Sequence, residues 1–317
     1  MPRRAIILMN LGAPDSPEAV LPFLINLFSD PAIITLPRIF RRPMAQLIAG
    51  RRLKTALDIY SYLGGGSPLL ANTEAQARAL EAALGDGSRC FIAMRHWHPT
   101  TEETAAAIEQ WGPEEIVCLP LYPQYSATTT GSSFSRWRSV AASYDFNNCP
   151  IREIESYPKA AGFIAALADL VGSMLDKVAT DAPGLRLLLS AHGLPLKIVD
   201  AGDPYPGQIG ETAEAVIAAL ARPGLDWTVC YQSRVGPLKW LGPGTDDEIR
   251  RAGRDGVGIV IVPISFVSEH SETLVELDHD YRNLAAACGV PDYYRVPAVG
   301  THPDFIEALA ALVREAA

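Results

Sequence analysis

Short apolar runs alternate with longer Ala- and Leu-rich stretches along most of the chain. Each run is apolar at nearly every position, which is typical of a strand that is covered on both faces, and the stretches between the runs have the period of amphipathic helices. Strands that alternate with helices form parallel sheets, so the pattern predicts an α/β protein of the doubly wound type. The predicted strands are residues 5–10, 90–94, 116–121, 185–190, 227–231 and 259–266.

The alternating pattern runs once before the turn at residues 147–150 and once again after it. A chain of 317 residues, of which 48% are hydrophobic, is large enough for two separate cores. We therefore predict two similar doubly wound domains, residues 1–152 and 153–298. They are followed by a C-terminal segment, residues 299–317, whose helix has no strand after it.

Composition limits the partners and the location of the protein. The net charge of −9 argues against nucleic acid as a partner, because such binding usually requires a basic domain. The first apolar run fits a strand better than a signal peptide, and no run approaches the roughly 18 apolar residues of a membrane span. The five cysteines are scattered without a C-x-x-C pair, so we expect a reducing compartment, the cytoplasm.

Polar residues that directly follow strands are the candidates for chemistry, since ligands of doubly wound sheets bind beyond the carboxyl ends of the strands. His192 follows the apolar run LRLLLSA, and Gly193 and Pro195 form a tight turn after it. Such a histidine can be structural, or it can work with a nearby carboxylate. The sequence contains neither of the common nucleotide-binding fingerprints and no G-x-S-x-G motif, so it indicates neither a nucleotide site nor a serine hydrolase.

Four carboxylates are spaced along the stretch FVSEHSETLVELDHDY: Glu269, Glu272, Glu276 and Asp280. On an α-helix these spacings place all four on one face, with no Lys or Arg between them. Like charges at this spacing destabilise a helix by about 0.2–0.5 kcal/mol per pair, so removing one should raise stability slightly. The line is either a solvated face or, together with His192, a site for a divalent metal and proton transfer.

The segment of residues 31–54 is basic and apolar, although the whole chain is acidic. Isoleucine, leucine, phenylalanine and methionine are interleaved with its basic residues, and it contains no acid. It is either a solvated basic face or a site for an anionic substrate tail or anionic lipid. The basic residues are Arg38, Arg41, Arg42, Arg51, Arg52 and Lys54.

Seven stretches, in order from residue 10 to residue 278, together resemble the ferrochelatases, lyases that insert ferrous iron into a porphyrin at the end of haem biosynthesis. The resemblance implies two domains, each with a parallel four-stranded sheet, a porphyrin cleft between them, and a C-terminal segment that packs back on the first domain. The matching stretches are NLGAPDS, YSYLGGGSPL, MRHWHPTTEE, LYPQYSATTTGSS, LLLSAHGLPLKIVDAGDPYP, YQSRVGPLKWLGP and FVSEHSETLVELD.

The resemblance assigns roles to individual residues of this chain. His192 corresponds to the active-site histidine and Glu272 to its acidic counterpart, both also as metal ligands, and Glu276 and Glu269 continue the catalytic set. Whether His192 accepts protons or binds iron stays open, as do the choice between protoporphyrin IX, which we expect, and coproporphyrin, and the oligomeric state. The implied porphyrin contacts are Leu11, Arg52, Tyr60, Ser67, Arg95 and Trp240.

The resemblance also bears on cofactors and on the membrane. Ferrous iron is a substrate, and no permanently bound cofactor is expected. Many relatives have Tyr where this chain has His96, so the pocket wall should be more polar here. The family often binds membranes peripherally at an apolar lip, and we expect residues 31–54 to make such contact on the inner face of the membrane.

Two other functions are compatible with the same residues. A non-catalytic carrier of a tetrapyrrole or metal would need an apolar cleft and Arg52, but it would not need the carboxylate line. A chelatase for another tetrapyrrole, such as sirohydrochlorin, would keep the fold and change the substrate. The GGGSP and YQSRVGP stretches favour the porphyrin enzyme.

We expect the purified protein to be colourless apart from bound porphyrin. Some ferrochelatases hold a 2Fe-2S cluster with one cysteine in the YSATTTGSS region and three in a C-terminal tail. This chain has Ala127 at the first position, and its sequence ends at Ala317 without the tail cysteines. Stoichiometric acid-labile sulfide, together with iron–sulfur absorbance in the visible spectrum, would contradict this expectation.

Overall fold

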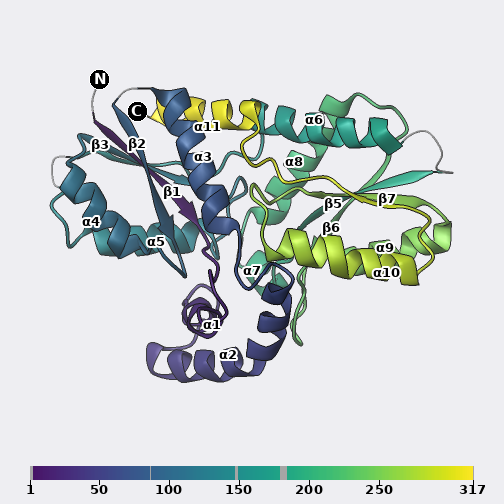
Figure 1. Ribbon diagram of the computed structural model, residues 1–317, viewed down its shortest axis with the longest axis horizontal. Coiled ribbons are helices and arrows are strands. Elements are labelled where there is room, and N and C mark those ends of the chain that lie inside the picture. The colour runs from purple at the N-terminus through teal and green to yellow at the C-terminus, as the bar shows by residue number, and fades with distance from the viewer. Residues whose placement is uncertain (1–2, 86, 147–148, 179–183, 317) are drawn as a thin grey trace. The chain divides into compact units, whose positions relative to one another are not determined.

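A computed structural model of the chain describes residues 3–85, 87–146, 149–178 and 184–316. The chain forms two compact units, one made of Met1–Ser156 with Leu309–Ala317 and the other of Tyr157–Ala308 (Figure 1). The predicted division into two domains, residues 1–152 and 153–298, and a C-terminal segment, residues 299–317, stays a prediction. The predicted turn at residues 147–150 lies partly outside the described residues.

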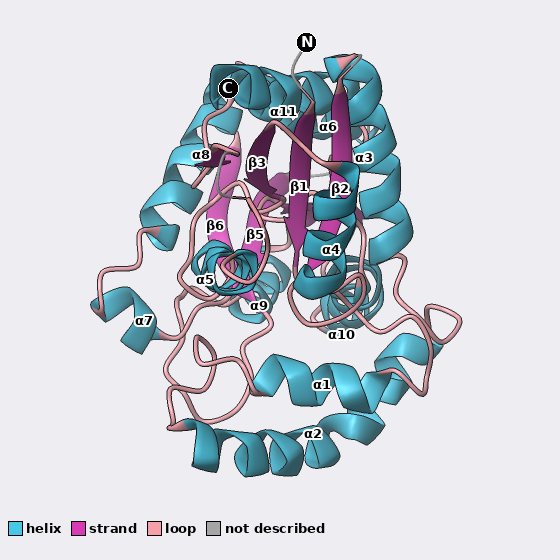
Figure 2. Cartoon of the chain, turned by 90° about the vertical axis from the view of Figure 1, so that its left-hand side faces the viewer, coloured by secondary structure: helices cyan, strands magenta, loops and turns pink. Residues whose placement is uncertain are grey.

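The first unit contains a four-stranded parallel sheet in the order β2-β1-β3-β4, of which Figure 2 labels β2, β1 and β3. Helices α4 and α5 share one apolar cluster with the central strand β1, which is buried over most of its length. The strands are β1 Arg4–Asn10, β2 Ser88–Met94, β3 Glu115–Pro120 and β4 Ile151–Glu153. The helices are α1 Val20–Phe28, α2 Arg38–Ser61, α3 Leu69–Leu84, α4 Thr101–Trp111 and α5 Thr130–Ala141.

The second unit repeats this plan with the strand order β6-β5-β7-β8, again entirely parallel. The strands are β5 Leu185–His192, β6 Asp226–Gln232, β7 Gly258–Pro263 and β8 Tyr293–Arg295. The helices are α6 Ala161–Val178, α7 Leu196–Asp200, α8 Tyr205–Leu220, α9 Thr245–Asp255, the π-helix η1 Glu272–Tyr281 and α10 Arg282–Ala287. The last helix, α11 Pro303–Ala316, begins in this unit and from Leu309 on is part of the first.

The predicted fold class, two doubly wound parallel sheets flanked by helices, is confirmed. The prediction missed β4 and β8, because edge strands of three residues are too short to leave an apolar run. It also extended the strand at 259–266 too far. The β7 strand ends at Pro263: the Ile264 N–H makes the last ladder bond, to the Ser190 carbonyl of β5, and also donates to the Val262 carbonyl two residues back as the chain turns out of the sheet.

No helix in the described part of the chain is both long and apolar enough to cross a membrane.

Candidate functional site

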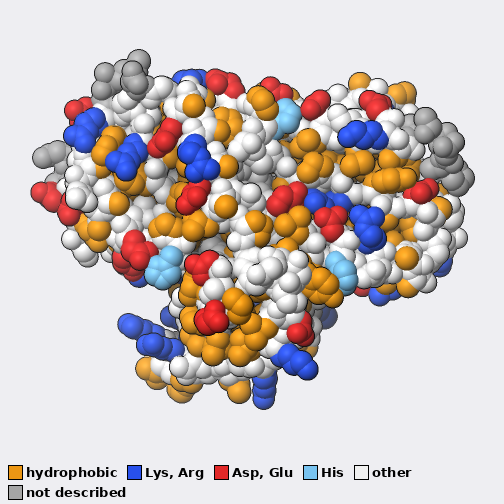
Figure 3. All heavy atoms as spheres, in the orientation of Figure 1, with side chains coloured by type: hydrophobic (Ala, Val, Ile, Leu, Met, Phe, Trp, Pro, Cys, Tyr) orange, Lys and Arg blue, Asp and Glu red, His pale blue; other side chains and the backbone are white. Residues whose placement is uncertain are grey.

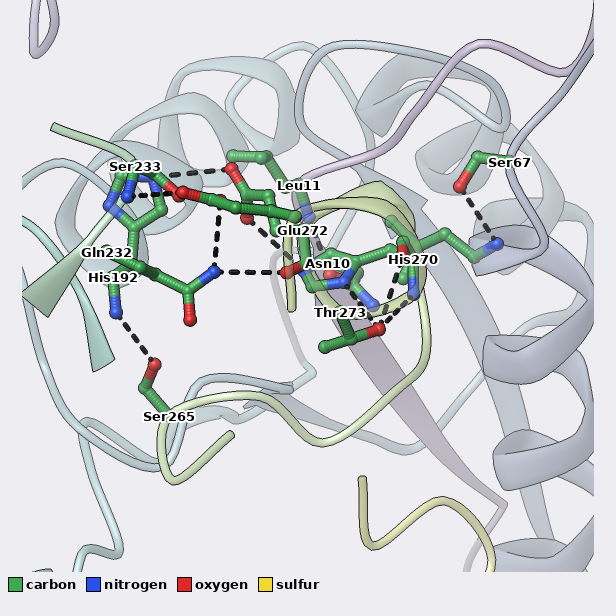
Figure 4. Close-up of polar contacts among 12 residues, drawn as sticks. Asn10, Leu11, Ser67, His192, Gln232, Ser233, Ser265, His270, Glu272 and Thr273 are labelled. Atoms are coloured by element: carbon green, nitrogen blue, oxygen red, sulfur yellow. Dashed lines mark hydrogen bonds and ion pairs between the residues drawn. The ribbon is translucent and has the colours of Figure 1, made fainter. Parts of the chain in front are cut away.

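His192 is the last residue of β5, and the turn after it fixes the orientation of its ring (Figure 4). The ring Nδ1 lies 2.6 Å from the Gly193 carbonyl oxygen. A carbonyl only accepts, so Nδ1 must carry a hydrogen and donate it, which leaves Nε2 facing the opposite way. Gly193 is required here because a Cβ on it would come within 2.7 Å of the Gln232 carbonyl oxygen on the neighbouring strand.

The Glu272 carboxylate lies between two imidazole rings. Its Oε1 is 3.3 Å from His192 Nε2, and its Oε2 is 3.3 Å from His270 Nε2. The His270 ring packs edge-on against Phe266, with 4.7 Å between the ring centroids. Sequence reasoning placed His270 among the polar residues after strands but gave it no role. The only signal was its position two residues before Glu272, in the loop after β7.

Charge pairing sets the protonation of this group. Desolvation lowers the pKa of His192, but the Glu272 carboxylate more than offsets that effect and raises the pKa to about 9. Burial raises the pKa of Glu272. The combined effect of His192 and then His270 is larger and opposite, so the pKa lies well below its usual range. At neutral pH the resting pair is therefore an imidazolium and a carboxylate. His192 can accept a proton or bind a metal only after it gives up the proton on Nε2.

The helix that carries the carboxylates is a π-helix rather than the predicted α-helix, and it begins later than predicted. Its hydrogen bonds run from i to i+5, which widens each turn. Glu269 precedes it and is not on the carboxylate line. Instead, Glu269 accepts hydrogen bonds from Arg295, at 2.8 and 3.1 Å, and from the Ala298 N–H, at 3.0 Å. The catalytic role that the resemblance gives to Glu269 stays a prediction.

Glu276 lies one turn after Glu272 and is held by neighbouring donors. Tyr281 donates its hydroxyl hydrogen to Oε1 at 3.0 Å, and Gln232 donates from Nε2 to Oε2 at 3.0 Å. Burial and the Glu272 charge raise the pKa of Glu276. The expected gain in stability on removing a carboxylate stays a prediction; at Glu276 these hydrogen bonds oppose it, since loss of the carboxylate would leave buried donors unpaired. Asp280, the last of the line, is exposed and lies 2.9 Å from the His279 ring.

The donors present allow only part of a metal site. Among the described residues, no group of three or more His, Cys, Asp or Glu side chains is arranged to hold a metal ion. His192 and Glu272 could supply two donors to a ferrous ion in transit, with the remaining ligands coming from the substrate.

The residues that the resemblance assigned to porphyrin binding are divided between the two units. In the second unit, Trp240 packs against Gly193, since a Cβ on that glycine would lie 3.3 Å from the indole ring. In the first unit, Leu11 follows β1, and Tyr60 is buried near the end of α2. Ser67 follows the glycine turn after α2, and its hydroxyl oxygen accepts a hydrogen bond from the Leu69 N–H.

The two arginines assigned to the porphyrin differ in their present partners. Arg95 already pairs with buried Asp30 at 2.8 Å and donates from Nε to Ser132 at 2.7 Å. Arg52, on α2, forms no ion pair within the described part of the chain. Of the two arginines, Arg52 is therefore the one whose whole guanidinium group can bind an anion.

His96 is not a surface loop histidine. Its ring is fully enclosed, with Nε2 3.7 Å from Asp30 Oδ2. Burial, and then the Arg95 charge, lower the pKa of His96 to about 3, so the ring is neutral. The residue adds a buried dipole beside Arg95 rather than a charge.

Comparison with known proteins identifies relatives along almost the full length. The family model for ferrochelatase matches residues 3–317. The chain is 53% identical over 316 residues to the ferrochelatase of Caulobacter vibrioides strain NA1000, with 98% of this chain and 89% of the relative covered. It is 55% identical over 311 residues to the ferrochelatase of Phenylobacterium zucineum, covering 96% and 89%.

Among solved structures, the chain resembles SirB from Bacillus subtilis with Fe3+, with a TM-score of 0.60 and 16% identity over 99% of this chain and 96% of that one. A likeness at this identity concerns the fold alone.

The pairing of His192 with Glu272 predicts a pH dependence of stability. The folded pKa of about 9 lies above the unfolded value of about 6.5, so protonated His192 stabilises the native state fully below pH 6.5. That contribution is lost as the pH rises through about 9. The difference in unfolding free energy between wild type and His192→Gln should shrink over this range, as measured by urea titration at several pH values. A difference that does not change between pH 6 and 10 would contradict the pairing.

Proposed function

Because the chain belongs to the ferrochelatase family, we propose that it inserts ferrous iron into a porphyrin, with protoporphyrin IX as the expected substrate, in the last step of haem biosynthesis. The single observation that carries the mechanism is the contact of the Glu272 carboxylate with His192 Nε2, at the carboxyl edge of the second sheet. A histidine and a carboxylate at a strand end can move protons and can contact a divalent cation.

The reaction requires proton transfer as well as metal binding. Two pyrrole protons leave for each ferrous ion that enters, so the charge of the macrocycle balances. His192 is the proposed group that meets the ring centre, after its Nε2 proton passes to the carboxylates. Glu276, whose pKa is raised by burial and by Glu272, is suited to hold such a proton. We propose Asp280 as the exposed end of this route.

Porphyrin binding is proposed to use residues of both units. Arg52 is the proposed partner of a propionate, because a guanidinium fork matches a carboxylate. Contacts with the periphery of the ring would fix the porphyrin and allow binding energy to offset distortion of the macrocycle at its centre. The further proposed contacts are Leu11, Tyr60, Ser67, Arg95 and Trp240.

We also propose that α2 makes peripheral contact with a membrane from the cytoplasm. Ile39 and Phe40 are 75% and 61% exposed, and Met44 and Leu47 are exposed on the same helix. Lys and Arg side chains border apolar ones where α2 lies in Figure 1, at the lower edge of Figure 3. An apolar surface with a basic border suits the interface of an anionic bilayer.

Vesicle binding tests this contact. The triple substitution of Arg38, Arg41 and Arg42 to Gln should weaken sedimentation with anionic vesicles, by about 1 kcal/mol for each charge near the surface. Binding of the wild type should fall with added salt, and the substitutions should have no effect on neutral vesicles. Equal sedimentation of the wild type and the triple variant would contradict the proposed contact.

A fluorescence assay distinguishes an enzyme from a carrier. Loss of free-porphyrin fluorescence after ferrous iron or zinc is added, at catalytic protein concentration, is the result expected for a chelatase. A carrier would bind the porphyrin and leave the fluorescence spectrum of the bound molecule unchanged when metal is added. Parallel assays with sirohydrochlorin would detect a chelatase of different specificity.

Substitutions along the carboxylate line should reduce metal insertion in a graded way. His192→Ala should lose several orders of magnitude in kcat and still bind porphyrin, because affinity comes from Arg52 and the walls of the site. Glu272→Gln should be nearly as damaging, Glu276→Gln intermediate and Asp280→Asn mild, since each lies further from the pair at His192. If both glutamine variants kept full activity, the carboxylates would have no role in the reaction and would form only a solvated helix face.

A further inference from the structure

Both carboxylate oxygens of Glu276 accept hydrogen bonds from neighbouring donors. A catalytic role of Glu276 would not by itself require so many of them. Ser233 supplies two of the four hydrogen bonds: its N–H donates to Oε1 at 2.8 Å, and its hydroxyl donates to Oε2. The side chains of Gln232 and Tyr281 supply the other two. A carboxylate has about four acceptor positions, so Glu276 has little freedom to turn.

Ser233 reaches Glu276 with both groups because of an unusual backbone conformation. Its φ is +59°, in the left-handed region that favours glycine. Within the described residues, only one other non-glycine residue, Ala221, has a positive φ. A serine in this conformation costs free energy that a glycine would not, and such residues persist where surrounding contacts hold them in place.

Gln232 connects this contact to His192 and Glu272. Gln232 is fully buried at the end of β6 and lies opposite His192 in the register of the sheet. Its Oε1 accepts from the Ser190 hydroxyl at 2.9 Å, and its Nε2 donates to Glu276 and also to the Glu272 carbonyl oxygen at 3.0 Å. The first turn of η1 is therefore tied to the same strand ends that place His192.

We propose that Ser233 is a positioning residue for the chelatase reaction. It holds the Glu276 carboxylate in one orientation and, together with Gln232, fixes η1 so that Glu272 faces His192. This inference rests on the proposed function, because the effect of losing this orientation appears in the rate of metal insertion. The strained serine is retained for its hydroxyl: a glycine at this position would keep the N–H and the turn but would lose the second bond to Glu276.

Two substitutions of Ser233 separate positioning from a merely structural role. Ser233→Gly keeps the backbone N–H and relieves the strain, so its melting temperature should equal or exceed that of the wild type. It removes the hydroxyl that helps to fix η1, the helix of the proposed metal ligand Glu272, so kcat for zinc insertion into a dicarboxylate porphyrin should fall roughly tenfold, a typical loss for an outer partner of a metal ligand. The porphyrin KM should stay unchanged. Ser233→Thr keeps the hydroxyl and adds a methyl group to a strained position, so it should melt earlier yet retain more of the wild-type kcat.

Ala221→Gly is the matched control. Ala221 has φ +50° at the C-terminus of α8 and is exposed, so the substitution relieves the same kind of strain away from the site. Its kcat should equal that of the wild type. The double variant Ser233→Gly/Glu276→Gln should be no slower than Glu276→Gln alone, because two residues that act through one contact are not additive.

The outcomes distinguish this inference from the function on which it rests. A wild type that inserts no metal overturns the proposed function, and this inference falls with it. An active wild type with Ser233→Gly as fast as the wild type overturns only the role of Ser233. Independent, multiplicative losses in the double variant would also overturn it, because Ser233 would then act elsewhere than through Glu276.

Discussion

The contact of one carboxylate with two imidazoles is the interaction on which the rest of the site depends. Glu272 faces Nε2 of His192, and the ring is turned this way because Nδ1 donates to the Gly193 carbonyl. That hydrogen bond in turn requires a residue without a Cβ at position 193, where the backbone lies against Gln232. The local geometry thus leads from a glycine, through the orientation of one ring, to an ion pair.

A second carboxylate, Glu276, lies beside this pair, and hydrogen bonds from its neighbours offset its repulsion from Glu272. Glu276 lies near the Glu272 charge in a half-buried position, and both effects raise its pKa. The donors on Ser233, Gln232 and Tyr281 favour the charged form and keep the side chain in place. The balance between repulsion and hydrogen bonding leaves a carboxylate that is held firmly and yet is able to take a proton, which supports its proposed part in proton transfer.

Much of the fold could be predicted, because long buried strands leave a continuous apolar run in the sequence. The run before His192 predicted both β5 and the position of the histidine at its carboxyl end. The edge strands β4 and β8 left no such run. Carboxylates spaced four apart fit one face of an α-helix and, nearly as well, of a π-helix, so their spacing could not distinguish the two. Sequence alone also gave no sign that Glu269 pairs with Arg295, which lies far along the chain.

The features that sequence could not reveal are those in which local preference yields to tertiary contact. The sequence around Ser233 does not indicate that this residue has a positive φ, because serine disfavours that conformation. Only its hydrogen bonds to Glu276 account for it. The π-helix is likewise attached to β6 through Gln232, and wide helical turns are uncommon unless contacts impose them. The left-handed Ser233 and the π-helix are both locally unfavourable, and both lie next to the ion pair of His192 and Glu272. An α-helix and a glycine would be more stable locally. A requirement on the position of the carboxylates therefore explains these two features better than stability does.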